Sequence, residues 1–120
     1  KARGLSLVSS EPLSFYGGVD PETGVVLEKG HPLEGKSVAR RVLVFPTGKG
    51  STVGSYTLYR LKKNGKAPAA LVARECETIV AVGAIISEIP CVDKVDTALI
   101  PDGAAVSVDG DAAEVRIEEA

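Results

Sequence analysis

The stretch "VARRVLVFPTGKGSTVGSYTLYRLKKNG", residues 38–65, holds a strand pattern, a glycine-rich loop and a helix pattern in direct succession. Val38–Pro46 is apolar and rich in β-branched residues, which predicts a buried strand that ends at the proline. A helix is predicted after the loop, because Asn64-Gly65 is a good stop signal and Lys62 and Lys63 place cations in its last turn. The order of strand, loop and helix indicates an α/β fold.

The patterns on both sides of this stretch extend the same architecture. Further strands are expected at Val25–Glu28, at Ala69–Ala73 and in the tail, where apolar residues alternate around an Asp-Gly pair that favours a hairpin (Val106, Val108, Val115 and Ile117). A second helix is expected within Glu77–Pro90, because four aliphatic residues at spacings of three and four share one helical face (Ile79, Val82, Ile86 and Ile89). Gly17–Gly24 is dense in turn-forming pairs and predicts a loop. We therefore expect a mixed sheet with two or three helices.

Composition places the chain among soluble single-domain proteins. Its 120 residues fit one domain, residues 1–120, with 44% hydrophobic and 25% charged residues. The net charge of -2, without a block of like charge, gives no indication of nucleic-acid binding. Apolar runs stay well short of the roughly 20 residues that span a bilayer, and the first residues lack a signal-peptide core. We expect a cytoplasmic protein that binds neither nucleic acid nor membrane.

The possible metal ligands are few. The sequence holds two cysteines, Cys76 and Cys91, and one histidine, His31. A structural zinc site needs about four Cys or His ligands, and an iron–sulfur cluster needs several thiolates. We therefore expect no metal site within this chain alone and two small buried thiols in a reducing compartment.

The glycine-rich loop does not match either common nucleotide-binding motif. A Walker loop ends in Gly-Lys-Ser or Gly-Lys-Thr, whereas here Lys49 is followed by Gly50. In the dinucleotide motif the glycines are two and three residues apart, but Gly48, Gly50 and Gly54 are two and four apart. What remains is a sharp turn whose following helix points free N–H groups back at the loop.

Two interpretations remain for the hydroxyl groups of that loop. Ser51 or Thr52 can cap the helix, which the pattern alone favours because cap serines far outnumber catalytic ones. Alternatively, Ser51 is a reactive serine whose deprotonated form is stabilised by helix N–H groups. A serine–histidine relay has little support, because His31 stands beside Pro32 in a connector and is expected to be exposed.

The motifs "SFYGGVDPETGVV", "VLVFPTGKGSTVGSYTLYRLKKNG", "APAALV" and "ETIVAVGAIISEIPCVD" together resemble the small subunits of the aconitase X superfamily, nearest to its archaeal-type phosphomevalonate dehydratases. The resemblance covers most of the chain. It implies a swivelling β/β/α domain like the mobile fourth domain of aconitase. It also implies a heterodimer with a large subunit that carries an iron–sulfur cluster of the 4Fe-4S type.

The resemblance further implies a reaction and a site. The reaction is dehydration of (R)-5-phosphomevalonate to trans-anhydromevalonate 5-phosphate, in an alternative mevalonate pathway to isoprenoids. Ser51 in "GKGS" matches the serine that acts as the base in aconitases. This match raises the catalytic interpretation above the cap. The surrounding loop would bind substrate or stabilise the oxyanion (Gly48, Lys49, Gly50, Thr52, Gly54 and Ser55). A first loop would approach the partner or the substrate, or would simply be a tight turn (Ser14, Gly17, Gly18 and Asp20).

One departure from aconitase concerns the substrate. Aconitases follow their serine loop with an arginine that binds a substrate carboxylate, but this chain has Val53 there. The anionic groups should therefore be bound mostly by the large subunit, and Arg40 and Arg41 are expected at the far end of the strand. Two alternatives remain: a cis-3-hydroxyproline dehydratase subunit, whose relatives tend to carry a cysteine in this loop, and a non-catalytic swivel or anion-binding module.

Overall fold

The structure is a computed structural model that describes residues 2–14, 18–49, 54–75, 78–110 and 114–118. Within these ranges, six strands form one mixed sheet in the order β6-β5-β3-β1-β7-β8, and two short strands form a separate pair, β2-β4. The strands of the large sheet are β1 (Ala2–Val8), β3 (Val42–Phe45), β5 (Ala70–Ala73), β6 (Cys91–Val92), β7 (Ala105–Asp109) and β8 (Glu114–Glu118). The pair consists of β2 (Leu13–Ser14) and β4 (Gly48–Lys49). The helices are α1 (Gly54–Lys63), α2 (Thr78–Ile86) and the short 3-10 helix η1 (Thr97–Leu99).

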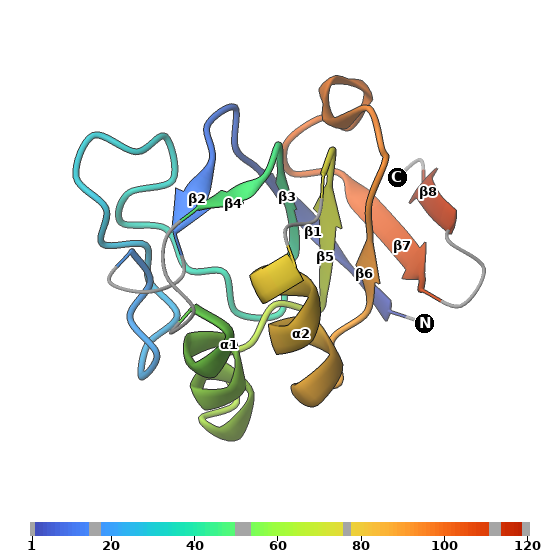
Figure 1. The fold of residues 1–120 in the computed structure, drawn as a ribbon. Helices are drawn as coiled ribbons and strands as arrows, with labels where there is room; N and C mark the ends of the chain where they lie inside the picture. The colour runs from blue at the N-terminus through green and yellow to red at the C-terminus, as the bar shows by residue number, and fades with distance from the viewer. Residues whose placement is uncertain (1, 15–17, 50–53, 76–77, 111–113, 119–120) are drawn as a thin grey trace.

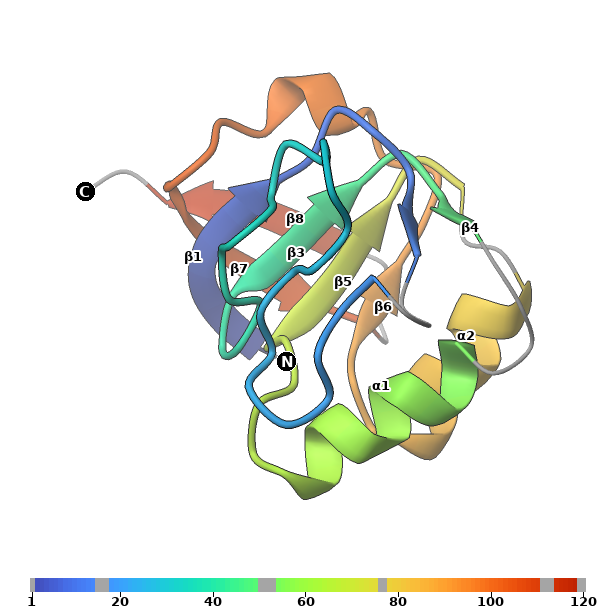
Figure 2. The same ribbon diagram turned by 90° about the vertical axis from the view of Figure 1, so that its left-hand side faces the viewer.

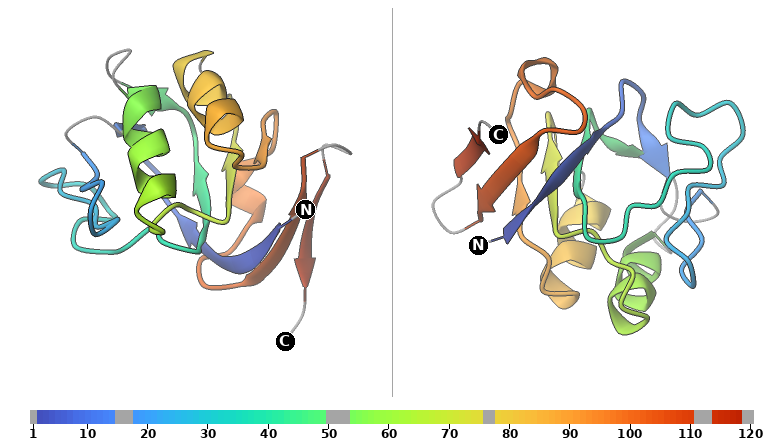
Figure 3. Two further views of the ribbon diagram at one scale, coloured as in Figure 1. Left: turned by 90° about the horizontal axis from the view of Figure 1, so that it is seen from below. Right: turned by 180° about the vertical axis from the view of Figure 1, so that it is seen from behind.

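The layers are helices, central parallel strands, and an antiparallel hairpin. β1, β3, β5 and β6 run parallel; β7 pairs antiparallel with β1, and β8 pairs antiparallel with β7. Figure 3 shows α1 and α2 on one side of the central strands, with the β7–β8 hairpin beyond the curled edge of the sheet. This arrangement confirms the expected α/β fold, its β/β/α layering and the predicted hairpin.

The central strands are buried on both faces, which explains their continuous apolar sequences. Leu43 and Phe45 of β3 belong to the core beneath the helices, together with Leu58 and Leu61 of α1. Alternate residues of the same strands belong to a second core that reaches β7 (Val42, Val44, Ala70, Val72, Val106 and Val108). Because both faces of these strands are buried, their sequences do not alternate between apolar and polar residues.

β3 is shorter than the predicted Val38–Pro46. Arg40 has a φ of 60°, a left-handed conformation that ends regular strand geometry. The Arg41 guanidinium turns back and donates from Nε to the Leu5 carbonyl (3.0 Å) and from NH2 to the Ser6 carbonyl (2.7 Å). The backbones approach closely here, since a Cβ on Gly4 would lie 2.8 Å from the Arg40 carbonyl oxygen. This corner therefore requires glycine at position 4.

One sequence prediction about local structure is wrong. Val25–Glu28 is not a strand of a sheet: Val26 forms only an isolated bridge with Val19, and Val25 only one with Ser37. The second helix is confirmed as α2, although Val82 and Ile86 of its apolar face are exposed while Ala84 and the following Ile89 are buried. The first helix is confirmed, and Gly65 follows it at a φ of 71° as a glycine stop.

Among the described residues, none of the helices has the length and hydrophobicity that a membrane span requires.

Candidate active site

The small β2–β4 pair brings the two glycine-containing segments together. Leu13 pairs with Gly48 and Ser14 pairs with Lys49 in parallel register. The N–H of Leu13 also donates to the Thr47 carbonyl at 3.1 Å, and the Leu13 side chain is fully buried. Figure 2 shows β4 and the first turns of α1 and α2 on the same side of the molecule. The segment after β2 and the segment after β4 therefore start side by side.

The structure describes part of the predicted loop. Gly48 and Lys49 form β4, and Gly54 and Ser55 begin α1. Gly50, Ser51 and Thr52 lie outside the described residues, as does Gly17 of the first loop. Ser14 lies in β2 opposite Lys49.

The first loop contains a turn that is held by its own hydrogen bonds. Asp20 Oδ1 accepts from the N–H of Glu22 at 2.8 Å, and the Asp20 carbonyl accepts from the N–H of Gly24 at 2.7 Å. The Asn64 side chain donates to the Pro21 carbonyl at 2.7 Å, which fastens this turn to the end of α1. Gly18, by contrast, is buried. The Asp20 carboxylate thus makes a contact to the local backbone that is typical of a tight turn.

His31 is buried, which corrects the expectation that it is exposed. It is 7% exposed, and both ring nitrogens have partners. Nδ1 accepts from the Leu33 N–H at 3.1 Å, so the proton resides on Nε2, which donates to the Pro12 carbonyl at 3.1 Å. The Ser9 hydroxyl lies 3.4 Å from the same Nε2. His31 fastens the connector to the chain between β1 and β2, and its role is structural.

An arginine that sequence reasoning missed lies at the carboxyl edge of the parallel strands. A cleft of about 340 Å³ opens there, lined by residues that include Ser9, Arg74, Thr97 and Asp102. Arg74 directly follows β5, and the next N–H, that of Glu75, donates to the Pro46 carbonyl at 3.0 Å. Arg74 is exposed, and it lies at the edge of the sheet where the chain leaves β3 for β4. Its guanidinium can therefore bind an anion at that edge. The available signal was a charged residue directly after a buried strand, at the edge where open α/β sheets bind ligands.

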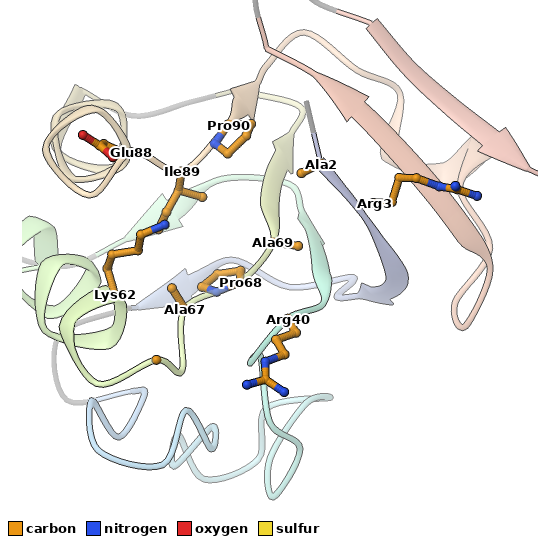
Figure 4. A pocket seen from close by; sticks show the side chains of 11 residues that line it. Ala2, Arg3, Arg40, Lys62, Ala67, Pro68, Ala69, Glu88, Ile89 and Pro90 are labelled. Atoms are coloured by element: carbon orange, nitrogen blue, oxygen red, sulfur yellow. The ribbon is translucent and has the colours of Figure 1, made fainter.

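A larger cavity of about 680 Å³ lies at the opposite edge of the sheet. Arg3, Arg40 and Lys62 are among its lining residues, but Figure 4 shows that their side chains point in different directions. They do not converge on a common ligand position. Arg40 and Arg41 precede β3, so they lie at its amino end, as expected, and away from the segment that leads into β4.

The sequence profile of the Aconitase X swivel domain matches residues 1–117 of this chain. The chain belongs to the aconitase X swivel-domain family. A protein of Thermococcus sibiricus named phosphomevalonate dehydratase small subunit is 58% identical over 119 residues, which cover 99% of this chain and 92% of the relative. A Methanocella arvoryzae protein of the same name is 56% identical, with 98% and 91% covered.

A solved structure agrees with this membership. The crystal structure of Thermococcus kodakaraensis aconitase X in its holo-form contains a chain that is 58% identical to this one. The match has a TM-score of 0.96 and covers 98% of this chain and 90% of that one. The β/β/α arrangement described above is thus the family fold.

Proposed function

We propose that this chain is the small subunit of a phosphomevalonate dehydratase, a hydro-lyase of the aconitase X superfamily. The observation that carries the proposal is the 58% identity, over 99% of this chain, to a relative named as that subunit. The reaction is dehydration of (R)-5-phosphomevalonate to trans-anhydromevalonate 5-phosphate, a step toward isoprenoids. The chain is active only with its large subunit.

Ser51 is the proposed base. The family resemblance supports this role over simple capping, since Ser51 in "GKGS" matches the serine that acts as the base in aconitases. Gly54 is the first residue of α1 that the structure describes. The flanking residues Lys49 and Gly54 are held by the β2–β4 pair and by α1, so the loop is anchored at both ends.

The proton transfer requires that the negative charge on the deprotonated Ser51 oxygen be stabilised. The C–H bond next to the substrate carboxylate breaks, its proton passes to the deprotonated Ser51 Oγ, and its electrons form the double bond as the β-hydroxyl group leaves as hydroxide. The proton on Ser51 is then released and combines with the hydroxide to give water, which restores the base. A serine hydroxyl is a weak base, so its alkoxide needs nearby hydrogen-bond donors. The first N–H groups of a helix have no intrahelical partners and favour negative charge. The N–H groups of Gly54 and Ser55, the first residues of α1 that the structure describes, are proposed for this task.

The residues of this chain do not fit an iron–sulfur cluster of their own. A cluster needs several thiolates, and the sequence offers only Cys76 and Cys91. Within the described ranges, no group of three or more Cys, His, Asp or Glu side chains is placed to hold a metal ion. We therefore assign the cluster of this family to the large subunit, together with most contacts to the substrate phosphate.

An assay of three substrates on the reconstituted pair, under anaerobic conditions, tests this function. The expected result is dehydration of 5-phosphomevalonate, with citrate and cis-3-hydroxyproline left unchanged. Preferential dehydration of hydroxyproline would reject the substrate while leaving the base open to test. A complex that assembles but acts on none of the three would favour a non-catalytic swivel module.

A further inference from the structure

Helix α2 is apolar on both its inner and its outer side. Its nine residues, "TIVAVGAII", include no charged side chain. Gly83, Ala84 and Ser87 are buried, and Ala84 belongs to the same core as Leu58 and Leu61 of α1. Among the residues whose side chains are described, the inner side thus carries small residues, which let the helix lie close to its neighbours.

Three large aliphatic side chains of α2 point outward. Val82, Ile85 and Ile86 are 46%, 75% and 52% exposed, and their spacing of three and four residues puts them on one face. We call these three residues the α2 outer face. A helix that is hydrophobic all round is normally buried on all sides. Contiguous exposed aliphatic residues of this kind mark an interaction site.

A cleft adjoins the α2 outer face and could accommodate a side chain of a binding partner. Its volume is about 390 Å³, and its lining includes Ala81, Ala84, Ile85, Pro90 and Cys91. The lining is largely apolar, and Gly110 of the β7–β8 turn closes it opposite α2. A protruding face beside a cleft is the shape that interface hot spots use.

The charges around the α2 outer face define the chemistry of its partner. Glu88 follows the helix and Asp93 lines the cleft, and both are exposed. α1 presents the opposite charge on its outer side, with Arg60, Lys62 and Lys63 exposed. The complementary surface is therefore aliphatic, with basic residues at the margin that meets Glu88 and Asp93.

We propose that the α2 outer face and its cleft bind the large subunit of the dehydratase, through an aliphatic segment with basic residues at its edge. This proposal rests on the proposed function, from which the partner is taken. Position supports it: α2 begins at the same side of the molecule as β4 and α1, between which Ser51 lies in the sequence (Figure 2). A large subunit that covers the active site therefore lies near the start of α2, about one to two turns before the α2 outer face. The relatives at 56–58% identity are themselves named small subunits.

Hydroxyl-radical footprinting of the unmodified complex tests the proposal without any substitution. Leu99 of η1 serves as an internal control, because its 72% exposure matches the 75% of Ile85. In the complex, Ile85 is expected to be labelled at least about fivefold less than Leu99, since burial in an interface core excludes water. Equal labelling of the two residues would overturn the proposal.

Matched variants of the co-expressed complex give a second measurement. Ile85→Glu should raise the Kd for the large subunit by about 100-fold, because a carboxylate would be buried without a partner. Ile85→Ala should raise it by about tenfold, and Leu99→Glu should leave it unchanged. Tight assembly of Ile85→Glu would reject the proposal. The proposal would also be rejected if two copies of this chain dimerised through the α2 outer face while Ile85→Ala and Ile85→Glu still bound the large subunit normally. An assembled wild-type complex that fails to dehydrate 5-phosphomevalonate would reject the proposed function alone.

Discussion

α1 and α2 lie side by side on the same face of the sheet, yet they present opposite surfaces to their surroundings (Figure 1). α1 buries Leu58 and Leu61 and exposes Arg60, Lys62 and Lys63, the pattern of a helix that faces water. α2 buries small residues and exposes Ile85 and its neighbours. The comparison separates the two proposed tasks: chemistry for the chain before α1, and assembly for the outer side of α2.

The largest expected effect separates these tasks at Ser51. Ser51→Ala should lower turnover of the complex by on the order of 10²- to 10⁴-fold, the usual contribution of a general base, while the subunits still assemble. Steady-state assays on complexes with verified one-to-one composition check this. Ser55→Ala and Thr52→Ala are the controls and should be milder. Near-normal turnover of Ser51→Ala would show that Ser51 is not the base.

The next effect concerns the inner sides of the helices. Leu61→Ala should lower the free energy of unfolding by about 2–5 kcal/mol, because it leaves a cavity in the core beneath α1. Ile86→Ala, on the outer side of α2, should change it by roughly 0.5 kcal/mol or less, as exposed substitutions do. Urea denaturation of the purified variants measures both. A large loss of unfolding free energy for Ile86→Ala would mean that other parts of this chain pack against the outer side of α2.

Much of this fold follows from the sequence, for a physical reason visible in β3 and β5. Strands buried on both faces must be apolar throughout, so Val42–Phe45 and Ala70–Ala73 could be located from composition alone. The hairpin followed from Asp109-Gly110 and from alternation on its two sides.

The failures have equally specific causes. The exposure of Val82 and Ile86 could not be predicted, because hydrophobic spacing locates a helix such as α2 without telling which of its apolar sides is buried. Val25–Glu28 has the composition of a strand, but its hydrogen bonds go to separate loop positions, including Gly18, Asp20 and Lys36. Pairing of two-residue strands such as β2 and β4 leaves no periodic signal at all.

Some residues of the candidate site could be predicted from the sequence, and others could not. Ser51 and its loop could be proposed from glycine spacing and family resemblance, both of which are local in sequence. Arg74 was missed: its one sequence signal was its place directly after a buried strand, and the parallel pairing of β3 with β5 is what puts that strand end beside Pro46. The burial of His31 likewise depends on Pro12 and Ser9, which are distant in the chain.

The smallest expected effect concerns Arg74, which precedes α2 as the Ser51 loop precedes α1. Arg74→Ala should raise KM for 5-phosphomevalonate about tenfold through loss of one charge-assisted contact to an anionic group. Arg74→Lys should recover part of the loss, because the charge returns without the planar fork. Arg60→Ala, on the exposed outer side of α1, is the matched control. An unchanged KM in Arg74→Ala would confine substrate binding to the loop before α1 and the large subunit.

The most direct test of the central claim is an experimental structure of the complex with 5-phosphomevalonate bound, in which one distance is measured. The account predicts that Ser51 Oγ lies about 3–3.5 Å from the carbon whose proton is removed, as a near-attack geometry requires. A substrate whose reacting carbon faces the large subunit alone, with Ser51 directed away from it, would contradict the claim that this chain supplies the base.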